Sequence, residues 1–215
     1  GIRRLLAVVG GSMGGMQTLQ WAVSYPDWME CVIPIATPGR ASAQSIAYNE
    51  VGRQAIFRDP AWKNGDYYGT PGPVDGLAVA RMLAMITYQS DEAMTRKFDR
   101  RLQNGDDVDL FRFETQFQVE SYLHYQGKKL VQRFDANSYL YLTRALDLFD
   151  LSRGYGSYEE ALSRIRCPML MVGVDSDILY PTYQQREIVD ILTRLGRPAE
   201  YVEMKSPWGH DSFLI

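Results

Sequence analysis

The segment Leu5-Leu6-Ala7-Val8-Val9-Gly10-Gly11-Ser12-Met13-Gly14 places a serine between glycines directly after five apolar residues. Such an apolar run is typical of a buried strand in a parallel sheet, and an apolar helical pattern follows from Met16 to Tyr25. The glycine-flanked serine fits G-x-S-x-G, a tight strand-to-helix turn in which larger flanking side chains would collide with neighbouring backbone. A phosphate-binding turn would need G-x-G-x-x-G or G-K-[ST], and neither is present. The segment therefore predicts a nucleophile elbow, with Ser12 as nucleophile and the backbone N–H of Met13 in the oxyanion hole.

A serine hydroxyl needs a general base, and histidine titrates in the suitable range. The chain holds two histidines. His124 lies among aromatic residues in a stretch with helical spacing, which favours a structural role on that helix. His210 lies in Pro207-Trp208-Gly209-His210-Asp211, in a loop directly after the last expected strand. Because this kind of fold presents its base there, His210 is the predicted base.

The acid that orients the base is expected after a strand between the serine and the histidine. Asp175 and Asp177 both follow the apolar run at residues 168–174, and their spacing does not decide between them. The chain order Ser…Asp…His is that of the α/β hydrolases, and it differs from the order in the two well-known serine protease folds.

The distribution of apolar residues divides the chain into two kinds of sequence. Further strands are expected at residues 31–36, 168–174 and 199–204, with an amphipathic helix at 183–195. Pro34 is placed near a strand end, since proline cannot donate to a central ladder. Between these α/β segments, residues 41–150 carry apolar residues at helical spacing. The prediction is an α/β fold with a doubly wound, mostly parallel sheet built from residues 1–40 and 151–215, and a helical insertion at 41–150.

Composition narrows the function classes. The formal net charge is -3, and no basic stretch favours a nucleic-acid or membrane surface. No apolar run approaches the roughly 20 residues that span a bilayer. Cys31 and Cys167 form no disulfide framework and no metal-ligand spacing, so no metal site is expected and a reduced, cytoplasmic location is favoured.

Several longer segments together resemble the homoserine O-acetyltransferase family. These are GGSMGGMQTLQWAVSYPD at the elbow, SAQSIAYNEVGRQAI at the start of the insertion, RFDANSYLYLTRALDLFD at its end, and VDSDILYP and GHDSFL around the acid and the base. The resemblance covers nearly the whole chain. It implies an α/β-hydrolase fold with a helical lid, and transfer of an acetyl group from acetyl-CoA to the hydroxyl of L-homoserine through an acyl-serine, in methionine biosynthesis.

The resemblance also assigns residues that spacing leaves open. The family's acid lies in S-D-x-L-[FY]-P, which selects Asp177 over Asp175. The aspartate after the family's histidine is thought to hold the substrate ammonium, and Asp211 occupies that position. An arginine and a tyrosine seven residues later contact substrate in the family, and Arg81 and Tyr88 match that spacing. A fork of arginine donors for a carboxylate, and a carboxylate for an amine, would suit a zwitterion such as homoserine.

Further properties are expected by resemblance alone. Family members carry a substantial portion before the elbow, so the first sheet strands and the second oxyanion-hole N–H are expected to be missing from this chain. Acetyl-CoA is expected as co-substrate rather than as a permanent cofactor. The lid helices are expected to form a homodimer.

Three alternatives stay open at this point. The acyl donor could be succinyl-CoA, or the acceptor serine or another alcohol, within the same family. A simple esterase would use the same triad with water as acceptor, although an apolar ester needs neither Arg81 nor Asp211. A non-catalytic binding protein is disfavoured by the presence of all three triad positions.

Overall fold

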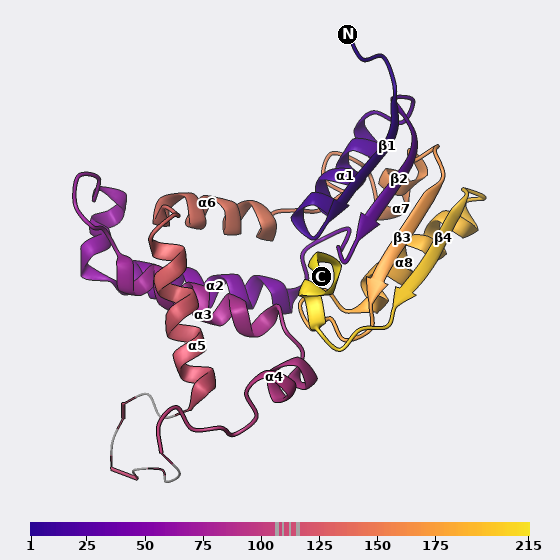
Figure 1. Ribbon diagram of the computed structural model, residues 1–215. Coiled ribbons are helices and arrows are strands. Elements are labelled where there is room, and N and C mark those ends of the chain that lie inside the picture. The colour runs from indigo at the N-terminus through magenta and orange to yellow at the C-terminus, as the bar shows by residue number, and fades with distance from the viewer. Residues whose placement is uncertain (106–107, 109, 112, 115–116) are drawn as a thin grey trace. The chain divides into compact units, whose positions relative to one another are not determined.

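The computed structural model describes residues 1–215 apart from 106–107, 109, 112, 115 and 116 (Figure 1). The chain divides into two compact units. One, called here the α/β unit, consists of Gly1–Ser42 and Leu148–Ile215, and the other, the helical unit, is Ala43–Asp147. The expected boundaries lie within three residues of this division. That the helical unit acts as a lid stays a prediction.

A four-stranded sheet forms the centre of the α/β unit. Its strands are β1 (Leu5–Gly11), β2 (Met29–Ile35), β3 (Met169–Val174) and β4 (Ala199–Met204), in the order β1-β2-β3-β4. All neighbouring strands pair in parallel, which confirms the predicted sheet. Pro34 lies opposite Gly10, one residue before the end of β2, where its missing N–H interrupts the ladder least.

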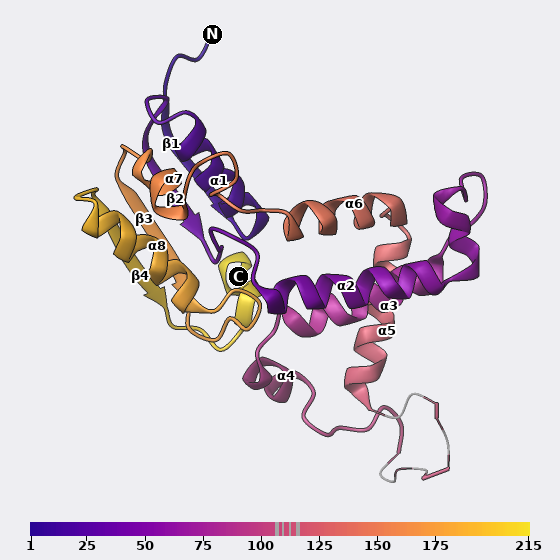
Figure 2. The same cartoon turned by 180° about the vertical axis from the view of Figure 1, so that it is seen from behind.

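Three helices pack on the sheet through one continuous core (Figures 1 and 2). They are α1 (Met13–Ser24), α7 (Tyr158–Ser163) and α8 (Thr182–Arg194). Leu19 from α1, Leu162 from α7 and Ile188 from α8 are fully buried together with Met171 of β3. Helix α7 was not expected from the sequence, because it is short and has no full amphipathic period. The core holds the carboxyl ends of β1, β3 and β4 in fixed register, and these ends carry the predicted triad.

Strand β1 lies at one edge of the described sheet. Its side chains Leu6 and Val9 are 77% and 57% exposed, which is unusual for apolar residues of a parallel strand. Apolar surface is therefore accessible at this edge in the described residues.

The helical unit contains α2 (Ala43–Arg58), η1 (Pro60–Gly65), α3 (Val74–Thr87), α4 (Asp91–Lys97), α5 (Gln118–Val131) and α6 (Ala136–Asp147). Its core joins Ile56, Leu77, Ala80, Leu130 and Ala136. None of the helices in the described part of the chain is long and apolar enough to cross a membrane.

Small residues let the central helices of this unit approach closely. A Cβ on Gly76 of α3 would lie 2.6 Å from the carbonyl oxygen of Ala55 on α2, and one on Gly127 of α5 would lie 3.0 Å from that of Ala78. Side chains at these positions would push the helices apart, so the two glycines determine how α3 packs between its neighbours.

A buried charge cluster joins α2 to α6. The Arg53 Nη1 atom lies 2.6 Å from Asp147 Oδ2, as an ion pair without favourable hydrogen-bond geometry. The two side chains are only 7% and 3% exposed. Glu50 adds a contact of 2.8 Å to Arg53, and Asn49 donates to Asp147 Oδ1. Removing one partner of such a cluster leaves a buried charge uncompensated.

Asp147→Ala is therefore expected to lower the free energy of unfolding by about 3 kcal/mol, since Arg53 would keep only the partly exposed Glu50 as counter-charge. Urea denaturation followed by far-UV circular dichroism measures this change. Asp27→Ala is the matched control, because Asp27 pairs with Arg166 at the surface and should contribute less than about 1 kcal/mol. Equal denaturation midpoints for the two variants would contradict the structural role of the cluster.

Candidate active site

Ser12 occupies a strained backbone conformation between β1 and α1, with φ 55° and ψ -121°. A non-glycine residue at positive φ costs about 1–3 kcal/mol and persists only where its surroundings hold it. Here the Ser12 N–H donates to the carbonyl of Ile35 at 2.9 Å, and the Thr37 hydroxyl donates to the Ser12 carbonyl at 2.8 Å. Both partners come from the end of β2 and the residues after it. The conformation of Ser12 thus depends on the neighbouring strand.

Crowding explains some of the glycines around Ser12. A Cβ on Gly10 would collide with the carbonyl of Gly14, as expected for the elbow. A Cβ on Gly15 would lie 2.6 Å from Cβ of Thr37, and one on Gly11 would overlap the Phe213 ring. At Gly14, by contrast, a Cβ would meet no described atom within 4 Å. The expectation that both flanking glycines avoid collisions therefore holds for Gly10 only, because Gly14 lies in an open first turn of α1.

The structure brings Ser12, His210 and Asp177 into one hydrogen-bonded row. His210 Nε2 lies 2.8 Å from Ser12 Oγ, and His210 Nδ1 lies 2.7 Å from Asp177 Oδ2. An ionised carboxylate only accepts hydrogen bonds, so Nδ1 carries the ring proton and Nε2 accepts from the serine hydroxyl. This is the tautomer that a general base requires.

The structure places Asp177, and not Asp175, against His210. Asp177 Oδ1 accepts from the backbone N–H groups of Leu179 and Tyr180 at 2.8 and 2.9 Å, which leaves Oδ2 for the imidazole. Asp175 turns to a different partner, the backbone N–H of Ser206 at 3.0 Å. The tight turn after β3 therefore separates the two carboxylates that spacing alone could not distinguish.

Aromatic rings enclose the imidazole. His210 is 3% exposed, and Tyr180 and Phe213 meet its ring edge-on at centroid distances of 5.2 and 5.4 Å. The expected loop around His210 is in fact a short 3₁₀ helix, η2 (Gly209–Leu214), which turns Phe213 back over the imidazole. Packing of this kind limits rotation of the ring and keeps water from its faces.

Met13 stays a predicted oxyanion-hole donor, and the structure shows where its backbone N–H lies in the helix. Met13 is the first residue of α1, so its N–H has no carbonyl one turn earlier in the helix to bind. The positive end of the α1 dipole lies at this N-terminus as well. This position suits one donor of an oxyanion hole.

A buried glutamine supports the elbow from α8, and the sequence reasoning missed it. Gln185 is fully buried, and its Nε2 donates to the carbonyls of Thr37 and Tyr180 at 3.0 and 3.3 Å. It thereby links the segment that holds Ser12 with the segment that follows Asp177. The available signal was a glutamine on the apolar face of an amphipathic helix, in line with Ile188 and Leu192.

Two of the predicted substrate-binding residues, Arg81 and Tyr88, lie together in the helical unit. The Arg81 guanidinium lies over the Tyr88 ring at 5.6 Å from its centroid. Tyr139 of α6 belongs to the same cluster. Burial raises the pKa of the Tyr139 hydroxyl well above its ordinary value, an effect that Tyr88 increases and Arg81 opposes. The sequence did not single out Tyr139.

Three further side chains considered in the sequence are Asp211, His124 and Cys167. Asp211 directly follows His210 in η2. His124 lies on helix α5 of the helical unit, as its helical spacing suggested, and its side chain is exposed. Burial raises the pKa of the Cys167 thiol, which disfavours the thiolate that a nucleophile would need. No group of three or more metal-ligating side chains occurs among the residues that the structure describes.

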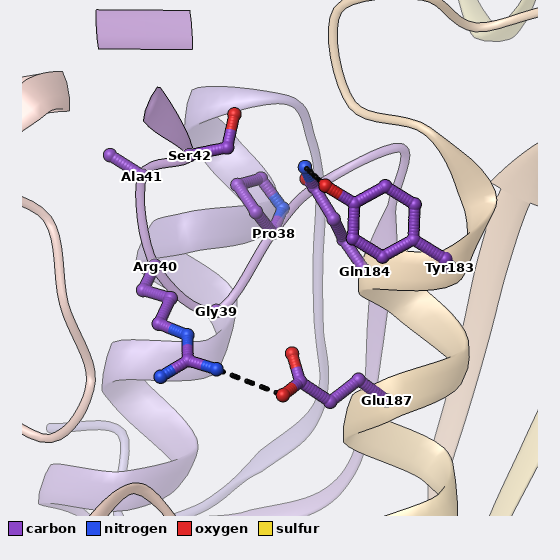
Figure 3. A pocket seen from close by; sticks show the side chains of 8 residues that line it. All are labelled: Pro38, Gly39, Arg40, Ala41, Ser42, Tyr183, Gln184 and Glu187. Carbon is purple, nitrogen blue, oxygen red and sulfur yellow. Dashed lines mark hydrogen bonds and ion pairs between the residues drawn. The ribbon is translucent and has the colours of Figure 1, made fainter. Parts of the chain in front are cut away.

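A separate cavity of about 270 Å³ lies in the α/β unit between residues 38–42 and the first turns of α8 (Figure 3). Its two charged residues, Arg40 and Glu187, pair at 2.9 Å across one side. Arg40 also lies over the Tyr158 ring, and its backbone bridges to Asp150 in the returning segment. Because these two charges neutralise each other, the cavity offers no unbalanced charge to a ligand.

Comparison with known proteins agrees with this geometry. A profile of the α/β hydrolase fold family matches residues 1–215. The chain is 62% identical to a homoserine O-acetyltransferase of Symbiobacterium thermophilum over 215 residues, which is all of this chain and 56% of that protein. It is 53% identical to one of Carboxydothermus hydrogenoformans, again over its whole length and 57% of the relative. The chain thus spans little more than half the length of the curated relatives that it matches.

Solved structures give the same fold over nearly all residues. The crystal structure of homoserine O-acetyltransferase from Bacillus anthracis superposes with a TM-score of 0.91 at 30% identity, covering 98% of this chain and 56% of that one. The crystal structure of esterase E22 superposes with a TM-score of 0.87 at 28% identity, covering 97% and 57%. The predicted resemblance and fold are confirmed. The same fold occurs in a structure named homoserine O-acetyltransferase and in one named esterase.

Gly15→Ala is expected to lower stability by about 1–3 kcal/mol, because the added methyl group overlaps Thr37 and disturbs its hydrogen bond to Ser12. Gly14→Ala is the matched control, one residue earlier in the same helix. It meets no described atom and should be neutral or stabilise α1 by up to about 1 kcal/mol. Thermal unfolding of both variants measures the difference, and equal melting temperatures would contradict the assigned role of Thr37.

Proposed function

The chain belongs to the α/β-hydrolase fold family, and on this basis we propose that it carries the catalytic triad of a homoserine O-acetyltransferase. The proposed reaction moves an acetyl group from acetyl-CoA to the hydroxyl of L-homoserine, in methionine biosynthesis. The observation that carries the chemistry is the row Ser12 Oγ, His210 Nε2 and His210 Nδ1, Asp177 Oδ2, with distances of 2.8 and 2.7 Å. The substrates are proposed from the likeness to the proteins that bear this name.

In the first half-reaction, His210 Nε2 removes the proton of Ser12 while Oγ attacks the thioester carbonyl of acetyl-CoA. Asp177 stabilises the imidazolium that forms. The Met13 N–H donates to the oxyanion of the tetrahedral intermediate. Collapse of the intermediate breaks the carbon–sulfur bond, and the imidazolium returns its proton to the departing thiolate. The products are free coenzyme A and acetyl-Ser12.

In the second half-reaction, the homoserine hydroxyl gives its proton to His210 Nε2 and attacks the acetyl-Ser12 carbonyl. The second tetrahedral intermediate expels Ser12 Oγ, which regains the proton from His210. The product is O-acetyl-homoserine, and the triad returns to its starting state. Water is the competing acceptor, so the acceptor must be held in place more firmly than water.

We assign acceptor recognition to Arg81, Tyr88 and Asp211. The Arg81 guanidinium is proposed to bind the homoserine carboxylate, and Asp211 its ammonium group. The contact between Arg81 and Tyr88 supports a joint role for this pair, because the face of the ring attracts the guanidinium. Tyr139 lies near enough for Arg81 and Tyr88 to influence the pKa of its hydroxyl.

The partners of the whole protein are proposed on the same likeness. Acetyl-CoA acts as a co-substrate rather than as a resident cofactor, and the setting is the cytoplasm. A homodimer through the helical unit is supported by exposed apolar side chains on its surface, among them Phe57, Tyr68, Tyr141 and Leu142. Several of these surround an open cavity of about 800 Å³ between α2 and α6, and a partner surface would cover it.

Ester hydrolysis is the second candidate, because the esterase E22 structure shares the fold over most of the chain. The triad serves both reactions, with water replacing homoserine in the second half. Arg81 and Asp211 favour the transferase, since an uncharged ester offers neither group a partner. Use of succinyl-CoA, or of another alcohol as acceptor, would retain the same mechanism.

Incubation of the full-length protein with acetyl-CoA is expected to add an acetyl group to Ser12, detected by intact-mass and peptide mass spectrometry. Homoserine should discharge this adduct within one turnover, whereas buffer alone should discharge it slowly. Ser12→Ala is the control and should acquire no adduct. A succinyl adduct from succinyl-CoA alone would change the donor, and no adduct from either donor in folded protein would favour the hydrolase.

Arg81→Ala is expected to reduce acetyl transfer to homoserine by about a hundredfold, the cost of losing a charged hydrogen-bonded pair of roughly 3 kcal/mol. Hydrolysis of a small activated ester should change little, because it needs only the triad. Arg58→Ala is the matched control, since Arg58 lies at the end of α2 and is exposed. Equal losses of both activities in Arg81→Ala would argue against a role in acceptor binding.

A further inference from the structure

We propose that Ser176 is a positioning residue that holds His210 within reach of Ser12 and Asp177, and that Asp175 is a weaker anchor of the same segment. The inference rests on the proposed function in one respect, since it takes His210 to be the base that activates Ser12. It assigns a role to Asp175 and Ser176, which precede the acid Asp177. Sequence spacing alone had left Asp175 as an alternative candidate for that acid.

The sheet alone does not position His210. The β3–β4 ladder ends with the pair Val174 and Met204, and one further backbone bond follows, from the Asp175 N–H to the Met204 carbonyl at 3.1 Å. His210 lies beyond this point, after residues 205–208, which belong to no helix or strand. Side chains of the turn after β3 contact the chain between the end of β4 and the imidazole.

Ser206, midway along this segment, is held through both of its backbone groups. Its N–H donates to Asp175 Oδ1 at 3.0 Å, and its carbonyl accepts from the Ser176 hydroxyl at 2.5 Å. Two consecutive side chains of the turn after β3 thus hold the two peptide groups on either side of Ser206. The Ser206 N–H donates in one contact and the Ser206 carbonyl accepts in the other, so both hydrogen-bonding groups of its backbone are satisfied by this turn.

The Ser176 oxygen has a second contact, directly beside the base. It accepts from the N–H of Gly209 at 2.9 Å. Gly209 is buried and adopts a φ of 73°, so the chain reverses there in a conformation that favours glycine, immediately before His210. One hydroxyl therefore connects residue 206 to residue 209 and ties both to the turn that carries Asp177.

Loss of the hydroxyl would leave the Gly209 N–H without its acceptor and release the reversal before His210. The two contacts of the imidazole, at 2.8 and 2.7 Å, leave little room for displacement. A shift on the order of 1 Å in a catalytic group can lower a rate by about a hundredfold. Asp175 acts farther from the base and shares its carboxylate with the exposed Lys205, so its loss should matter less.

The test measures the rate at which a serine-reactive phosphonate labels Ser12 in the full-length protein, together with kcat and KM for acetyl transfer. Ser176→Ala is expected to slow labelling and lower kcat by about tenfold to a hundredfold, with KM for both substrates nearly unchanged. Ser176→Thr, which keeps the hydroxyl, should recover most of the rate. Asp175→Ala should show a smaller loss of the same kind.

Ser163→Ala is the matched control. Its hydroxyl also donates to a backbone carbonyl, that of Glu160, but within α7. It should label at the wild-type rate. If Ser176→Ala does not fold, the labelling rate of Asp175→Ala is compared with that of Ser163→Ala instead, and Asp175→Ala should be the slower of the two.

A His210→Ala background separates positioning from general stability. If Ser176 acts through His210, Ser176→Ala should slow the residual labelling of Ser12 no further once the imidazole is gone. An equal proportional loss in both backgrounds, or a wild-type rate in Ser176→Ala alone, would overturn the inference. Absence of labelling in the wild-type protein would instead overturn the assignment of Ser12 as nucleophile, and this inference with it.

Discussion

The positive φ of Ser12 is the constraint on which the α/β unit depends. A serine in that conformation aims its hydroxyl away from the sheet, at a cost of about 1–3 kcal/mol that the surrounding structure must offset. Ile35 and Thr37 supply the compensating hydrogen bonds from the end of β2. Gly15 permits Thr37 to approach, and Gln185 fixes the Thr37 carbonyl from α8. Helix, strand and nucleophile are thus coupled through a few short polar contacts.

Much of this arrangement follows from local sequence. The apolar runs of parallel strands, the glycines beside Ser12 and the order Ser…Asp…His are linear signals, and each places a residue at a carboxyl strand end. The choice between Asp175 and Asp177 is different. It depends on which carboxylate accepts the N–H groups of Leu179 and Tyr180, a property of the turn that spacing does not encode. Only the resemblance to longer motifs selected the acid before the structure did.

Contacts between distant segments were beyond sequence reasoning. Phe213 lies on Gly11 and against His210, so a residue three positions after the base explains a glycine one position before the nucleophile. Gln185 connects Thr37, which follows β2, with Tyr180, which follows β3. In the sequence alone, Gly11 is one glycine among several, and Gln185 is a polar residue on the apolar face of a helix with no evident partner. Their roles appear when the fold brings their partners together.

The triad cannot by itself separate acyl transfer from hydrolysis, because the first half-reaction is the same in both. In the proposed reaction, selectivity arises in the second half, where an acetyl-serine would meet either an alcohol or water, and water is present in large excess. An alcohol prevails only if binding supplies a high effective concentration at the reacting carbonyl. A zwitterionic acceptor allows this, since each of its charges can be held by an opposite one. The pair of Arg81 and Tyr88 therefore bears on the proposed acceptor more directly than the triad does, because a guanidinium held near an aromatic ring is a suitable partner for a carboxylate.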